Sequence, residues 1–137
     1  FVNSSLAHNT KAGIDLFVSK RQTLGVLVLA NFSNNSGTGS SSTPIAAQNN
    51  KIPNRILTAN SQSSSRRNNF TANLNYKWED TTGRQLTADA DYGLYVLDSE
   101  GIVPNVYSNA QTGALLSQTT FGTVTPVQIN LYSLKAD

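Results

Sequence analysis

The sequence predicts an antiparallel all-β fold, on three observations. Apolar and polar residues alternate over several long segments, which is the side-chain period of a β-strand. Short polar connections join consecutive alternating segments, as they do in β-hairpins. Charged residues make up only 13% of the 137-residue chain, while Asn, Ser and Thr are abundant, a usage more typical of an extracellular β-rich protein than of a cytosolic helical one. The fold class is therefore an antiparallel meander of hairpins.

Residues 11–19 and 23–32 are predicted to form the first hairpin. Even-numbered residues are apolar in both segments, so they share a face when residues of equal parity pair. The expected register pairs Val18 with Leu24 across a short charged turn at residues 20–22.

The most regular pattern is a second hairpin, from residues 68–78 and 84–96. Its even-numbered residues are again apolar, with aromatic side chains near the turn. The expected register pairs Tyr76 with Leu86 and leaves residues 79–83 as the loop.

On the polar face of this hairpin, the same register sets Asn73 opposite Asp89 and Thr71 opposite Asp91. Two carboxylates on one face are a possible acid–base pair of a glycosidase. Because no activating neighbour or second cluster accompanies them, we interpret both as structural residues bonded to Asn73 and Thr71, and expect no catalytic residue and no enzymatic activity.

Residues 126–137 are predicted to form the last strand. Its alternation changes parity near Leu131–Tyr132. A β-bulge at that point explains the change, and so does a strand that leaves a membrane there.

A long polar stretch at residues 33–67 and a long mixed one at residues 97–124 are expected to be loops, in contrast to the short turns. Within them, residues 52–62 are a possible extra strand, which Pro53 would place at an edge, and residues 114–120 are another possible strand. In a transmembrane barrel, short turns lie on the periplasmic side and long loops outside. Loops on a rigid scaffold often carry recognition, so the expected ligand-facing loop residues are Asn49, Asn50, Arg66, Arg67 and Tyr107.

Composition excludes several other functions. The chain has no Cys and a single His8, so we expect no metal site and no cofactor. A net charge of +2 is too small to indicate a nucleic-acid partner. No apolar run reaches the ~18 residues of a membrane-spanning helix, which leaves a β-barrel as the only transmembrane alternative.

The alternating hairpins fit two environments. A soluble antiparallel sheet packs its apolar face on a protein core, whereas a barrel wall turns its apolar face to lipid and its polar face to the lumen. The pattern alone favours the soluble sheet over the barrel wall, because soluble antiparallel sheets are the commoner of the two.

Three collinear blocks, residues 13–26, 73–92 and 129–137, resemble the outer-membrane β-barrel family of Bacteroidota, which is related to TonB-dependent receptors. The resemblance implies an arc of a barrel in the bacterial outer membrane, with lipid, the rest of the barrel and its plug, and the TonB system as partners, and a parent that takes part in nutrient uptake. Five strands are fewer than the ~8 of the smallest barrels, so we expect residues 1–137 to be one segment of a larger protein. The alternative is a soluble cell-surface β-sandwich or adhesin-like module that binds glycan or protein.

Overall fold

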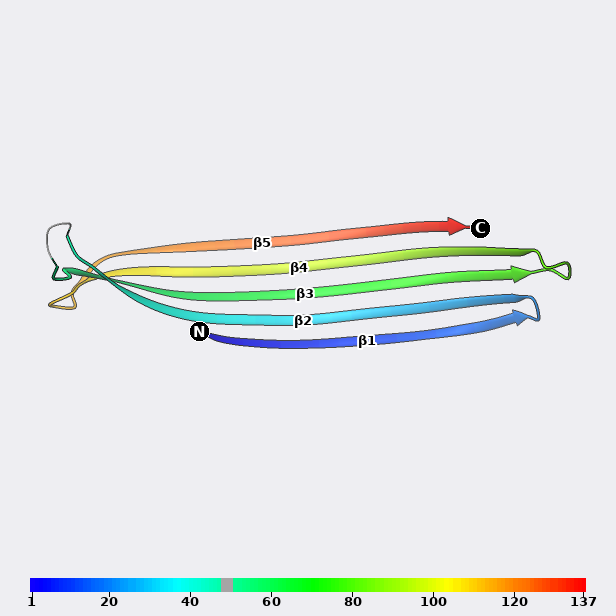
Figure 1. Cartoon of the computed structure of the whole chain (residues 1–137), viewed down its shortest axis with the longest axis horizontal. Coiled ribbons are helices and arrows are strands. Elements are labelled where there is room, and N and C mark those ends of the chain that lie inside the picture. Colours follow the sequence, from blue (N-terminus) through cyan, green and yellow to red (C-terminus); the bar gives the residue numbers. More distant parts are fainter. Residues whose placement is uncertain (48–50) are drawn as a thin grey trace. The chain divides into compact units, whose positions relative to one another are not determined.

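The computed structural model describes residues 1–47 and 51–137 and forms one five-stranded antiparallel sheet with the strand order β1-β2-β3-β4-β5 (Figure 1). Each strand therefore pairs with its neighbours in sequence, which confirms the predicted all-β meander. The strands are β1 (Val2–Ser19), β2 (Gln22–Ile45), β3 (Arg55–Glu79), β4 (Gln85–Asn109) and β5 (Leu115–Ala136).

The strands are much longer than the sequence predicted, because most of the expected loops 33–67 and 97–124 are strand. Low apolar content predicted loops there. The polar side chains instead bond across strands: Ser5 donates to Asn35 at 2.6 Å, and Ser40 donates to Asn60 at 2.7 Å. Cross-strand polar pairs and the backbone ladder stabilise a sheet without an apolar face.

Contacts divide the chain into two compact units. Unit 1 comprises Phe1–Leu6, Asn34–Ser65 and Asp98–Thr125. Unit 2 comprises Ala7–Ser33, Arg66–Leu97 and Pro126–Asp137.

The turn between β4 and β5, in unit 1, is held by Asn109. Its side-chain oxygen accepts hydrogen bonds from the backbone N–H groups of Gln111 and Thr112, at 2.8 and 2.9 Å. Gly113 follows with a φ of 71°, a left-handed conformation that glycine adopts at little cost. This side-chain cap and the glycine end β4 and reverse the chain.

In unit 2, the turn between β3 and β4 is organised by Asp80. Its carboxylate accepts hydrogen bonds from the Thr82 hydroxyl at 2.8 Å and from the backbone N–H of Thr82 and Arg84 at 2.7 and 2.9 Å. The Thr82 hydroxyl and then the Arg84 backbone N–H lower the pKa of Asp80 below its ordinary value of 3.8, since they bond to the charged form. Gly83, with a φ of 87°, completes a three-residue loop of the bulged type.

This tight turn changes the register predicted for the second hairpin. The backbone N–H of Asp80 bonds to the carbonyl of Arg84 at 2.9 Å, so the loop is shorter than residues 79–83. Asn73 therefore faces Asp91 rather than Asp89. The expected register was wrong by two residues, and because the shift is even, every side chain keeps its predicted face.

The first hairpin shows the same kind of shift. Asn31 bonds to Asn9, and Ser5 bonds to Asn35. In the register of these two pairs, Val18 does not face Leu24, so the predicted pairing of this hairpin is also wrong by two residues. Parity is preserved here as well, so the alternation fixed the faces while the turn fixed the pairing.

A bulge was one of two explanations for the parity change at Leu131–Tyr132, and the structure has none at these two residues. Tyr92 packs on Tyr132 with ring centroids 5.2 Å apart, and Thr87 and Asp137 exchange both backbone hydrogen bonds at 2.9 and 3.0 Å. These pairs share one register. The parity change therefore means that Leu131 and Tyr132 simply point to opposite faces of the sheet. Nearer the β4–β5 turn, where Asn109 bonds to Ala114, the register differs by one residue.

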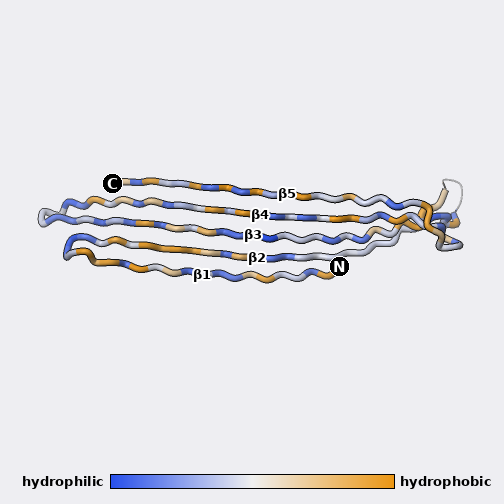
Figure 2. Tube along the Cα trace, turned by 180° about the vertical axis from the view of Figure 1, so that it is seen from behind, coloured by the Kyte–Doolittle hydropathy of each residue, from blue (hydrophilic) through white to orange (hydrophobic). Residues whose placement is uncertain are grey.

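Neither unit has a buried core in the part of the chain that the structure describes. No hydrophobic side chain there is buried, and many large ones are exposed, among them Leu134 at 87% and Tyr132 at 78%. Figure 2 shows hydrophobic residues spread along the strands, with a marked hydrophobic stretch in β2 beside the β1–β2 turn. Within residues 1–47 and 51–137 there is no helix long and apolar enough to cross a membrane.

Candidate functional site: the two faces of unit 2

The even-numbered residues of unit 2 form one face of its strands, which we call the even face. One depression on it is lined by Leu74 and Tyr76 of β3, Ala88 and Ala90 of β4, and Leu134 and Ala136 of β5. The odd-numbered positions Asp89 and Lys135, between these residues in the chain, also border it. A second depression is lined by Val26, Ala72, Tyr92 and Tyr132, among others. The prediction that the apolar residues of both hairpins share a face is confirmed.

No charged side chain occurs on the even face over most of its length. All even-numbered positions within residues 10–18, 22–32, 68–78, 86–96 and 128–136 are uncharged. The charged residues of these segments are all odd-numbered. The two faces therefore differ in charge as well as in hydropathy.

Aromatic side chains bracket this apolar surface. At one end, Tyr92 lies between Phe70 and Tyr132, with ring centroids 6.4 and 5.2 Å away. At the other end, next to the turns, lie Tyr76 and Trp78. Trp78 follows Phe70 by eight positions in β3, about 27 Å along the strand at ~3.4 Å per residue. That length is close to the ~25 Å height of the apolar band of an outer-membrane barrel.

The polar tip of Tyr92 points away from the centre of this surface. Its hydroxyl donates to the Asn130 side chain at 3.1 Å. A tyrosine whose ring packs on other aromatic rings and whose hydroxyl is hydrogen-bonded is typical of positions where apolar and aqueous environments meet.

The odd-numbered residues form the opposite face of unit 2, the odd face, which carries a polar network. Asn73 donates to Asp91 at 2.7 Å, and Asn75 donates to Asn73 at 3.4 Å. Asp91 therefore bonds to Asn73 instead of the predicted Thr71. The bond predicted between Asp89 and Asn73 is not formed, and Asp89 makes no side-chain hydrogen bond with the residues that the structure describes. The interpretation of Asp91 as a structural, bonded residue fits this geometry.

Gly25 makes room for this network in β2. It is buried, and a Cβ atom added to it would lie 2.5 Å from Asn75 Oδ1 and 2.7 Å from Asp15 Oδ1. The polar side chains of β1 and β3 therefore lean over β2 at the place where no side chain stands. This close approach is a common reason for glycine inside a strand.

Ion pairs also lie on the odd face. Lys77 pairs with Glu79 at 3.4 Å, and Lys135 pairs with Asp137. All four side chains are about half exposed or more, so each pair contributes little stability. What matters is their location: all four charged residues lie on the odd face, so the even face has none of these charges.

Of the five predicted ligand-facing residues, the structure describes three, and none of these three lies in a loop. Asn49 and Asn50 lie outside the described residues. Arg66 and Arg67 lie within β3 and Tyr107 within β4, so their placement in loops was wrong, for the reason that strand pairing extends through the polar segments. Adjacent Arg66 and Arg67 point to opposite faces. A ligand contact of these residues stays a prediction.

No group of three or more His, Cys, Asp or Glu side chains able to hold a metal ion occurs in the described part of the chain. No protein-family model matches the chain, and a search of curated proteins finds no match either.

Proposed function

We propose that this chain is part of the wall of a bacterial outer-membrane β-barrel, and that its parent is a TonB-dependent receptor-like protein that takes part in nutrient uptake. The observation that carries the proposal is the even face: an apolar, charge-free surface with aromatic side chains at both ends, backed by an odd face that holds the charged residues of these strands together with some apolar ones, such as Phe17 and Leu131. Lipid is the solvent that favours this combination.

The cost of charge in a bilayer explains why the distribution of charge matters. An Arg or Lys on the lipid face costs about 2–4 kcal/mol at the bilayer midplane. The polar residues of the odd face, such as Asn73 and Asp91, bond to one another and face the lumen in the proposed barrel. Because successive side chains point to opposite faces, the even-numbered residues of each strand contact lipid and the odd-numbered residues contact the water of the lumen in the proposed barrel.

The proposal also accounts for the exposure of large apolar side chains. Leu134 is 87% exposed and Tyr132 is 78% exposed, a state that is unfavourable in water over a contiguous surface. Contact with outer-membrane lipid removes this cost. The outer edges of β1 and β5, which lack a neighbour among the described strands, pair in the proposed barrel with further strands of the parent.

The other partners follow from the proposed family: the plug that fills the lumen and the TonB system, both through the parent protein. We assign the chain no catalytic role, no cofactor and no nucleic-acid partner.

A soluble cell-surface sandwich that binds glycan or protein is the rival. It requires a second sheet over the even face, with side chains that fill the depressions beside Leu74 and Ala90. In that arrangement the aromatic residues at the two ends are core residues and have no reason to avoid the centre.

Trp78 offers the test, because it is the single Trp of this chain and lies at one end of the even face. The parent protein is reconstituted in phosphatidylcholine vesicles, with and without bromine-labelled acyl chains, and its fluorescence is compared with that of a Trp78→Phe variant. The difference signal reports Trp78 alone. Quenching by the brominated lipid supports a lipid-facing wall; an unquenched Trp78 in a folded parent contradicts it and favours the sandwich.

A further inference from the structure

Unit 1 has no apolar face in its parts of β2 and β3. Residues 34–44 of β2 and 58–65 of β3 are Ser, Thr, Asn, Gln and Gly, apart from Pro44 and Ala59. Figure 2 shows this part of β2 in pale and blue tones, unlike the hydrophobic stretch beside the β1–β2 turn. Since alternate residues of a strand point to opposite sides, neither side of these two segments is hydrophobic.

Side-chain hydrogen bonds occur on both sides of unit 1. At even-numbered positions, Ser40 donates to Asn60 at 2.7 Å. At odd-numbered positions, Ser5 donates to Asn35 at 2.6 Å. Hydroxyl and amide groups keep further donors and acceptors after one such bond, and the transfer of these from water to hydrocarbon is costly. Both sides therefore favour contact with water.

Charge follows the same division between the units. In unit 1, β4 carries Asp98 and Glu100 at even-numbered positions. In unit 2, the even-numbered positions of β4 within residues 86–96 are all uncharged. An ionised carboxylate is costly in the hydrocarbon of a bilayer, so the even-numbered positions of β4 suit lipid in unit 2 and water in unit 1.

Large apolar residues of unit 1 are divided between its two sides. In β5, the adjacent residues Leu115 and Leu116 are 63% and 49% exposed, and in β3, Ile56 is adjacent to Leu57. Adjacent residues of a strand point to opposite sides, so neither pair builds a continuous apolar surface. Apolar side chains scattered in this way are normal on a surface that contacts water.

Strand length leaves room for such a division. β2 has 24 residues, whereas a transmembrane β-strand needs about 9–11. Its segment in unit 2, residues 22–33, is by itself long enough to cross a bilayer. Residues 34–45 are therefore not needed for the crossing.

We infer that the lipid-contact surface of this chain is confined to unit 2, and that the strands of unit 1 contact water on both sides. The inference rests on the proposed function and defines which part of the chain has lipid as its partner. The polar strand segments of unit 1 are then accessible from both sides to dissolved molecules.

Single cysteines test the inference, because the chain contains no Cys. Ser41→Cys and Ser42→Cys place a cysteine on opposite sides of β2 in unit 1, at two exposed positions. Val26→Cys is the matched control on the even face of unit 2, in the same strand. Each variant of the parent, with any other cysteine replaced by serine, is labelled with a maleimide fluorophore and folded into phosphatidylcholine vesicles. Quenching is measured with dissolved iodide and, separately, with brominated acyl chains.

We expect iodide to quench the labels at residues 41 and 42 several-fold more strongly than the label at residue 26, and brominated lipid to quench only the label at residue 26. Lipid quenching at residue 42 as well as residue 26 would overturn the inference and leave the proposed function intact. A label at residue 41 that iodide does not reach would reveal a covered side and would also overturn it. No lipid quenching at residue 26 in a folded parent would refute the proposed function, and the inference with it.

Discussion

Replacing Leu134 by arginine tests the proposed orientation of the even face most directly. Leu134 lines the same depressions as Leu74 and Ala90, about midway between the two aromatic ends of the band. An arginine at the midplane of an outer-membrane barrel costs about 2–4 kcal/mol. At an exposed position in water, the same change stays within about ±0.5 kcal/mol, and Leu134 is 87% exposed in this structure. The two solvents therefore predict clearly different free energies of unfolding.

Ser133 provides a matched control in the adjacent position of β5. It is exposed and points to the opposite, odd face, so Ser133→Arg places the same charge at the same depth but away from lipid. The parent protein is folded into phosphatidylcholine vesicles, and its free energy of unfolding is measured by denaturant titration for both variants. We expect a loss of about 2–4 kcal/mol for Leu134→Arg and little change for Ser133→Arg.

Depth adds a second criterion. Ala136 lies nearer the Trp78 end of the band than Leu134 does, so Ala136→Arg should cost less, because the penalty falls towards the interface. Equal effects of Leu134→Arg and Ser133→Arg would refute the assignment of the two faces. Equal large losses at Leu134 and Ala136 would refute the bilayer as the cause, since a protein core has no such depth dependence along β5.

Two further predictions concern the β3–β4 turn. Gly83→Ala should destabilise the parent by about 1 kcal/mol, because the φ of 87° is left-handed and costs an L-residue this much; Gly93→Ala, whose Cβ would lie 3.5 Å from Leu131 in ordinary contact, should not destabilise it. The lowered pKa of Asp80, caused first by the Thr82 hydroxyl, means that the charged carboxylate stabilises the folded state. That contribution is complete above the unfolded pKa and is lost as the pH falls through the folded one, so the stability difference between the parent and its Asp80→Ala variant should be constant above about pH 5 and shrink below about pH 4. A difference that grows on acidification would contradict the predicted direction.

Strand pairing explains where the sequence-based predictions stopped. Alternation with period 2 assigned faces correctly in both hairpins, because a strand has only two faces. Alternation did not distinguish between registers that differ by two residues. In the second hairpin, the hydrogen bonds of Asp80 in the β3–β4 turn select one of these registers. Likewise, the polar stretch at residues 33–67 lacks the apolar pattern of a strand, yet Ser40 and Asn60 bond across strands within it.

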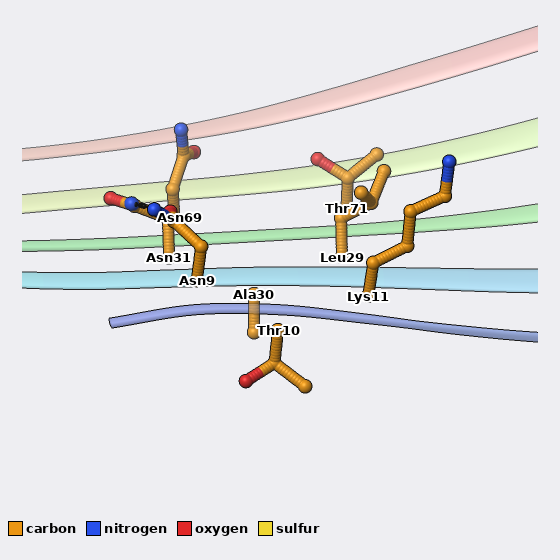
Figure 3. A pocket seen from close by; sticks show the side chains of 8 residues that line it. All are labelled: Asn9, Thr10, Lys11, Leu29, Ala30, Asn31, Asn69 and Thr71. Atoms are coloured by element: carbon orange, nitrogen blue, oxygen red, sulfur yellow. Dashed lines mark hydrogen bonds between the residues drawn. The ribbon is translucent and has the colours of Figure 1, made fainter. Parts of the chain in front are cut away.

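The hollow on the odd face of unit 2 that is lined by Asn9, Asn31 and Asn69 (Figure 3) could not be predicted from the sequence, for the same reason. Asn9, Asn31 and Asn69 are far apart in the chain and carry no shared motif. Only the register brings them side by side, and a register different by two residues would separate them.

The amino-acid sequence was enough to predict the fold class, the more apolar face of each alternating segment and the absence of charge from that face, because these features depend on nearest neighbours along a strand. Which residues of different strands meet, how far the strands extend and where the odd face is hollow became known from the structure. Those features depend on turn geometry and on hydrogen bonds between distant segments, which local sequence does not specify.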